Sequence, residues 1–209
     1  MHRTKSFRRC SIAVALAMAL LAWPAISDAQ LTSTTPTVVG DASAARVSVL
    51  GILGTTTTTA LADTGTLSGA NDARDASMVT GSVPSTLSAE TLSAATISWV
   101  DQVDSYASLG NLNITVAGVG ITADSVVARA SQVLGAAGSG SSILSNLSIN
   151  GTSIAVTGAP NQAIWIPGGQ VIINEQTISP TGTAVVNALH VAVTGVADVV
   201  IASATAGIS

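Results

Sequence analysis

One segment, VIINEQTISPTGTAVVNALHV (residues 171–191), contains both an acidic and an imidazole side chain that could share acid/base chemistry. Glu175 is one of two glutamates in the chain, and His190 is the only histidine beyond the first two residues. A carboxylate and an imidazole within hydrogen-bond reach can act together as general acid and base. The distance between these two side chains therefore decides whether the segment can be catalytic.

A tight turn between the two residues sets their predicted distance. Residues 179–182, Ser-Pro-Thr-Gly, match the positional preferences of a type I turn. Such a turn pairs Glu175 with Val186 and His190 with Val171, which places the two polar side chains on one face but four residues apart. At about 3.3 Å per residue the separation is roughly 13 Å. We therefore expect each to be a hydrogen-bonded structural group at the rim of the domain, and not a catalytic pair.

Other catalytic chemistry has little support. The chain has no cysteine beyond Cys10 and no GxSxG nucleophile elbow. The aspartates of NDARD (Asp72, Asp75) and DQVD (Asp101, Asp104) are interpreted as solvated loop charges, with calcium binding left open, because no repeated spacing supplies a full shell of oxygen ligands. The sequence thus predicts no catalytic residues, no cofactor and no metal site.

The first 29 residues, MHRTKSFRRCSIAVALAMALLAWPAISDA, have the order of a secretory signal peptide. Four basic residues precede an apolar run from about residue 12 to residue 23, and small residues close the segment as a signal-peptidase site requires. The run is shorter than the roughly 20 residues of a membrane helix, and Pro24 ends it. We expect cleavage before Gln30 and export of a mature chain without a membrane span.

The charge of the expected mature chain excludes whole classes of partner. After residue 29 the chain holds three arginines, no lysine and ten carboxylates, a net charge of −7. Nucleic-acid binding needs a basic surface that neutralises phosphates, and three scattered arginines do not supply one. The sequence therefore predicts no nucleic-acid partner.

Strand signals dominate the remainder. Segments such as ARVSVLGIL, NLNITVAGVGI, TAVVNALHVAV and DVVIASATAG are rich in Val, Ile and Thr and alternate apolar with small polar residues. We interpret residues 30–40 as a linker or edge strand and residues 41–209 as a single all-β domain. Short strands and tight turns predict a mostly antiparallel, β-sandwich-like domain built from short hairpins.

Two hairpins have a predicted register. The Asn-Gly pair of LSINGTSI suits a type I′ turn, in which both central residues have positive φ, and it pairs Ile149 with Thr152. The Gly-Gly pair of IWIPGGQVII permits a second two-residue turn, which pairs Ile166 with Val171.

The C-terminal half also carries a family resemblance. The segments ITADSVVARASQV, LSNLSINGTSI, PNQAIWIPGGQVIINEQTI, VNALHVAV and ADVVIASATAGI resemble those of bacterial secreted proteins called the choice-of-anchor P family. The resemblance covers about residues 105–209, with a weaker likeness from Gly40 onward. It implies a secreted or cell-surface protein and no assigned activity. Because no sorting motif follows Ala206, we expect release and not covalent anchoring.

Together these observations predict a secreted, non-enzymatic structural or adhesive β protein of the bacterial cell surface or matrix. Its expected partners are surface polysaccharide or further copies of itself joined through edge strands. One alternative is a glycan-binding module with Trp99 or Trp165 as a stacking platform. A second is a hydrolase that uses Glu175 with an aspartate, as paired carboxylates do in glycosidases.

Overall fold

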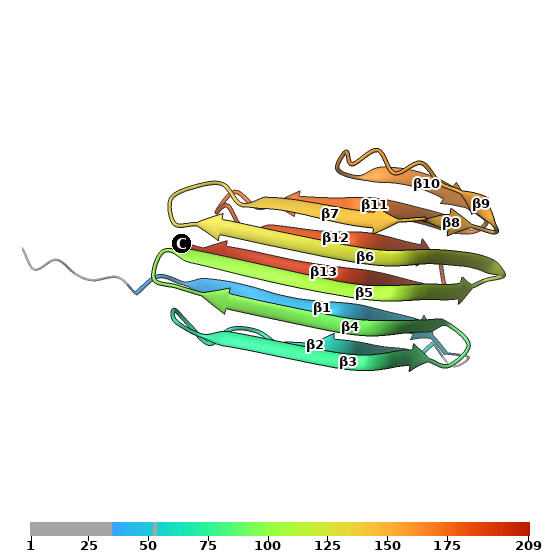
Figure 1. The fold of residues 1–209 in the computed structure, drawn as a ribbon, viewed down its shortest axis with the longest axis horizontal. Helices are drawn as coiled ribbons and strands as arrows, with labels where there is room; N and C mark the ends of the chain where they lie inside the picture. The colour runs from blue at the N-terminus through green and yellow to red at the C-terminus, as the bar shows by residue number, and fades with distance from the viewer. Residues whose placement is uncertain (1–34, 52–53) are drawn as a thin grey trace, which may run out of the picture. The chain divides into compact units, whose positions relative to one another are not determined.

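Thirteen strands and no helix form the part of the chain that the computed structural model describes, residues 35–51 and 54–209 (Figure 1). The predicted signal peptide lies outside the described residues, as do residues 30–34 of the predicted linker, whereas residues 38–40 belong to the first strand. The strands are β1 (Val38–Leu50), β2 (Thr56–Asp63), β3 (Ala73–Val83), β4 (Leu87–Ser98), β5 (Gln102–Val116), β6 (Val119–Val133), β7 (Ser139–Ser145), β8 (Ser148–Ile149), β9 (Thr152–Ser153), β10 (Gln162–Ile166), β11 (Gly169–Ile178), β12 (Ala184–Val193) and β13 (Ala197–Ile208).

The strands form two antiparallel sheets. Sheet A has the order β10-β11-β12-β13-β1-β2, and sheet B has the order β3-β4-β5-β6-β8-β9, with β7 also paired to β6. Strands β13 and β1 of sheet A pack on β4, β5 and β6 of sheet B. The predicted all-β, antiparallel sandwich is confirmed.

Several strands are longer than the predicted short hairpins. The segment NLNITVAGVGI, predicted as one strand, contains the end of β5, a two-residue turn and the start of β6. Ala117 and Gly118 form that turn with φ of 49° and 78°, and Val116 pairs with Val119 across it. An alanine at positive φ carries no turn signal in the sequence, so this turn was missed.

The core is made of small and branched apolar side chains from both sheets. Fully buried examples are Leu92, Ile114 and Ile121 from sheet B and Leu189 and Ile201 from sheet A. Apolar burial on this scale is the main stabilising contribution in a domain without disulfides.

A buried glutamine joins three segments at one end of the sandwich. Gln132 is 2% exposed, and its Nε2 donates to the carbonyls of Ala136 and Thr181 at 3.1 Å each. Its Oε1 accepts from the backbone N–H of Ile208 at 2.8 Å. One side chain thus holds the β6–β7 turn, the β11–β12 turn and the C-terminal strand together.

Side chains along the strands of sheet A alternate between the core and the outer face, and this alternation shifts by one residue at the same height in neighbouring strands. In β12 the adjacent residues Ala188 and Leu189 are both fully buried, whereas a regular strand would bury only one of them. Asn174 of β11 and Ala202 of β13 flank Ala188 in the ladder and have φ of 53° and 50°. Because the irregularity occurs at the same height in neighbouring strands, the residue pairing between these strands is the same on both sides of it.

Sheet B reverses in the same way. In β5 the buried positions change from odd numbers, ending at Leu109, to even numbers, beginning at Leu112. Asn111 lies between them with φ of 47°, and Thr91 of β4 has φ of 49° at the adjacent irregularity of the ladder. The outer faces of both sheets therefore carry residues that strict alternation would place inside.

The predicted hairpins had mixed outcomes. The Asn150-Gly151 turn is confirmed, with φ of 50° and 75° and Ile149 paired with Thr152. The pairing of Ile166 with Val171 is wrong, because Ile166 pairs with Gly169. The turn residues there are Pro167 and Gly168, a proline followed by a glycine at φ 76°, which suits a type II turn.

The predicted register of the β11–β12 hairpin is wrong by one residue. The expected bond from the Gly182 N–H to the Ser179 carbonyl is present at 2.9 Å. Gly182 has a φ of 89°, however, and acts as an extra bulge residue after the turn, so Ile178 pairs with Ala184 instead of Thr183. This shift moves every predicted pair between the two strands.

Candidate functional site

Glu175 and His190 lie in hydrogen-bond contact, so the predicted separation of roughly 13 Å is wrong. The distance from His190 Nδ1 to Glu175 Oε2 is 3.0 Å. Two features of the fold close the gap: the bulge at Gly182 pairs Glu175 with Asn187, and the reversal at residues 188–189 turns Asn187 and His190 to the same outer face. His190 is therefore the next outward-facing side chain after Asn187.

The imidazole belongs to a chain of side chains across three strands. On the far side of the ring, His190 Nε2 lies 3.0 Å from Asp198 Oδ2 of β13. Asn187 Nδ2 donates to Glu175 Oε2 at 2.6 Å. Sequence reasoning missed Asp198, because only the pairing of β12 with β13 brings it beside the ring.

This cluster bonds three neighbouring strands to one another. Burial of the His190 ring opposes protonation, but hydrogen bonds and charge interactions with Asp198 and Glu175 outweigh it and raise the pKa of His190 above its usual value. Protonated imidazole can donate to both carboxylates at once, whereas the neutral ring can donate to only one. The two ring nitrogens thus contact carboxylates on both neighbouring strands, which links β11, β12 and β13.

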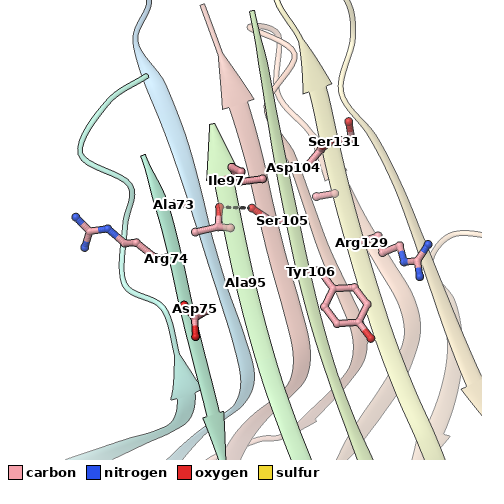
Figure 2. A pocket seen from close by; sticks show the side chains of 12 residues that line it. Ala73, Arg74, Asp75, Ala95, Ile97, Asp104, Ser105, Tyr106, Arg129 and Ser131 are labelled. Carbon is pink, nitrogen blue, oxygen red and sulfur yellow. Dashed lines mark hydrogen bonds between the residues drawn. The ribbon is translucent and has the colours of Figure 1, made fainter. Parts of the chain in front are cut away.

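A shallow groove lies on the outer face of sheet B (Figure 2). Its volume is about 480 Å³. One row across the sheet runs from Asp75 on β3 through Ala95 on β4 and Tyr106 on β5 to Arg129 on β6. The small side chain of Ala95 leaves a hollow between the taller side chains of Asp75 and Tyr106.

A second row extends the groove along the strands. It consists of Ala73, Ile97, Asp104 and Ser131, which occupy the four strands two residues away from the first row. At about 4.8 Å between neighbouring strands, Asp75 and Tyr106 stand roughly 10 Å apart at their backbones. The groove is therefore wide enough for one six-membered ring.

The two arginines that line the groove make different contacts. The guanidinium carbon of Arg129 lies 5.5 Å from the centre of the Tyr106 ring, within the range of a cation–π contact. Arg74 turns away from the hollow in Figure 2, and its Nε lies 3.2 Å from Asp72 Oδ2. The backbone N–H and hydroxyl of Ser68, together with Arg74, lower the pKa of Asp72 to about 2. Arg129 is thus the cation available to the groove.

A buried polar contact fixes the strands beneath the groove. Thr96 and Ser105 point into the core from β4 and β5, and their hydroxyls lie 2.7 Å apart. Ser105 Oγ donates to the Thr205 carbonyl on β13 of sheet A. The Thr96 hydroxyl must therefore donate to Ser105. This chain ties the middle of sheet B to sheet A under the positions that carry Ala95 and Tyr106.

The tryptophans and aspartates considered from sequence have different places. Trp165, on edge strand β10, is 79% exposed, and Trp99, next to the β4–β5 turn, is 40% exposed. Neither lines the groove. Asp75 and Asp104, interpreted as loop charges, lie on strands and line it together. Sequence reasoning missed Tyr106 as a site residue, because no local pattern shows that it stands beside an alanine of another strand.

The described residues contain neither a candidate metal centre nor a candidate membrane helix. No cluster of three or more His, Cys, Asp or Glu side chains in residues 35–51 and 54–209 is arranged to hold a metal ion. Within the same residues, no helix has the length and apolarity needed to span a membrane.

The chain has no match among protein-family models, curated proteins or solved structures.

Proposed function

We propose that the protein is an exported, non-enzymatic adhesive module that binds neutral polysaccharide in the groove beside Tyr106. The observation that carries the proposal is the hollow above Ala95, with an aromatic ring on one side and a carboxylate on the other. The bacterial surface or matrix is the proposed location, in keeping with the leader-like first 29 residues and the choice-of-anchor P resemblance.

The groove offers what a sugar ring needs. The axial C–H groups of a pyranose pack on apolar and aromatic surface, and Tyr106, Ala95 and Ile97 supply it. Asp75 and Asp104 can accept hydrogen bonds from sugar hydroxyls, and Arg129 can donate them. Because Arg129 stacks on Tyr106, the ring position is already constrained before a ligand arrives, which lowers the ordering cost of binding.

The charge of the protein favours neutral over acidic glycans. Two carboxylates and two arginines line the groove, and one of the arginines, Arg74, is paired with Asp72. The chain from residue 35 onward carries ten carboxylates against three arginines. An acidic polysaccharide would meet repulsion from the net negative charge of the protein surface.

A carboxylate hydrolase has weaker support. Glu175 and Asp198 contact opposite nitrogens of the same imidazole ring, so His190 occupies the space between them. A glycosidase needs the scissile bond of its sugar in that space.

Binding of the purified exported protein to a panel of neutral and acidic polysaccharides tests the proposal. We expect affinity for a neutral member, lost by about tenfold or more in Tyr106→Ala and largely kept in Tyr106→Phe, which retains the ring. Ala95→Leu should fill the hollow and abolish binding without unfolding the protein, because Ala95 is exposed.

A matched control separates the groove from general surface effects. Ala163→Leu makes the same change at another exposed strand position, on β10, and should bind like the native protein. Binding that is confined to acidic polysaccharides, or that depends on Trp165 and survives Tyr106→Ala and Ala95→Leu, would show that the proposed site is wrong.

A further inference from the structure

The two flanks of the sandwich differ in the length of their free strand edges. On one flank, β2 of sheet A and β3 of sheet B are edge strands of 8 and 11 residues, and they contact each other. On the other flank, the outermost strands are β10 with five residues, β7 with seven, and β9 with two. A long edge presents an unbroken row of unpaired backbone N–H and C=O groups.

The middle of the long flank carries no charged side chain and no proline, two of the devices that usually protect an edge. Its ladder to β4 is irregular only at Val79, where the pairing passes from Met78–Leu92 to Thr80–Glu90. Soluble proteins discourage edge-to-edge pairing with charged side chains, prolines or interruptions. Residues 76–83 of β3, ASMVTGSV, contain no charge and no proline, and neither do residues 56–62 of β2, TTTTALA. Val79 of β3 is 82% exposed and Met78 beside it is 39% exposed. This flank therefore combines free backbone edges with exposed apolar side chains.

We propose that this flank is the interface of a symmetric dimer, in which β3 pairs antiparallel with β3 of a second copy and extends sheet B across both molecules. Antiparallel self-pairing about a two-fold axis makes the interface isologous, so the same residues serve both copies. The proposal concerns a surface separate from the Tyr106 groove and does not depend on what the groove binds.

The distribution of charge determines where a second copy can approach. From residue 35 onward the chain has a net charge of −7, so two copies repel each other over most of their surfaces. Centring the pairing on residues 76–83 sets uncharged residues opposite uncharged residues. Arg74 and Asp75 then lie at the ends of the paired segment, where no like charge of the partner stands opposite them.

The small size of the contact predicts weak association. Stable interfaces bury about 1,200–2,000 Å² in total, and one strand pair with its flanking side chains lies at or below the low end of that range. We expect a dimer that dissociates at roughly micromolar or higher concentrations.

Analytical ultracentrifugation of the protein purified from the exported fraction of an expressing culture tests this interface. Across increasing concentrations we expect the mass to rise from one chain to two. Val79→Lys should weaken the dimer at least about tenfold, because two lysines would stand directly or nearly opposite each other in the paired strands. Ile143→Lys is the matched control: Ile143 is 57% exposed on β7, at the opposite flank, and its replacement should leave the dimer intact.

Hydrogen exchange gives a second, independent measurement on the native protein. Backbone amides of residues 76–83 should exchange more slowly at concentrations where the dimer forms, and those of β7 should not change. A single chain at every concentration, open-ended growth beyond two chains, or dissociation by Ile143→Lys and not by Val79→Lys would each overturn the proposal.

Discussion

Replacing Gln132 with leucine should remove one attachment of the end of the C-terminal strand. Leucine has nearly the volume of glutamine, so Gln132→Leu keeps the packing and removes only the hydrogen bonds. The Ile208 N–H is then left without its acceptor in a residue that is 2% exposed. An unpaired buried donor costs about 1–3 kcal/mol.

The loss of the hydrogen bonds to two carbonyls lowers the free energy of unfolding by less. Ala136 and Thr181 are exposed turn residues, so water can replace the amide of Gln132 at about 0.5 kcal/mol each. The expected loss in free energy of unfolding is therefore about 2–4 kcal/mol. For a domain of this size, that loss lowers the Tm by roughly 4–16 °C.

Thermal unfolding followed by circular dichroism measures the effect. Gln102→Leu is the control, since Gln102 is only half-buried and bonds to the side chain of Asp104 at the surface. We expect its stability to change by no more than about 0.5 kcal/mol. If Gln132→Leu unfolds at the same temperature as the native protein, the inferred role of this amide is refuted.

Three other predictions follow from residues already described. The pKa of His190 is raised in the folded protein, so its stabilising effect should be fully present below the unfolded pKa of about 6.5 and lost as the pH rises through the folded pKa. The Tm advantage of the native protein over His190→Gln should therefore shrink from pH 6 to pH 9. A Tm advantage that grows with pH would contradict this sign. Gly151→Val should destabilise the protein by about 1 kcal/mol or more in chemical denaturation, because a β-branched residue resists the φ of 75°, and an unchanged midpoint would count against the turn. Mass spectrometry of the exported protein should find Gln30 as the first residue, and recovery of Met1 or Cys10 in that fraction would disprove the predicted cleavage.

Local signals predicted those parts of the structure that depend on neighbouring residues alone. The alternation of Val, Ile and Thr with small polar residues is sufficient to predict strands, because a strand needs only side chains that fit a pleated, half-buried surface. The turn at Asn150-Gly151 was also predictable, since these two residue types tolerate positive φ without help from the rest of the fold.

Pairs of residues distant in the sequence were predicted less well, and the errors have a common cause. A one-residue bulge changes every partner along a hairpin, and Gly182 introduced one between β11 and β12. The reversal of alternation at Ala188 and Leu189 then turned His190 toward Glu175. The residue types alone do not reveal that reversal, because Ala202 and Asn174 lie in neighbouring strands at the same level and both have positive φ.

The amino-acid sequence by itself determined the all-β class, the antiparallel character, the low basic charge and the Asn150-Gly151 hairpin. These follow from composition and from contacts within a few residues of each other. The tertiary structure alone decided that Asp198 reaches His190, that Tyr106 stands beside Ala95, and that β2 and β3 form one long free flank. Each of these depends on strand order and register across a sheet, and both are set by the packing of the two sheets as a whole, because shifting one strand by a residue would move its buried side chains to the solvent face.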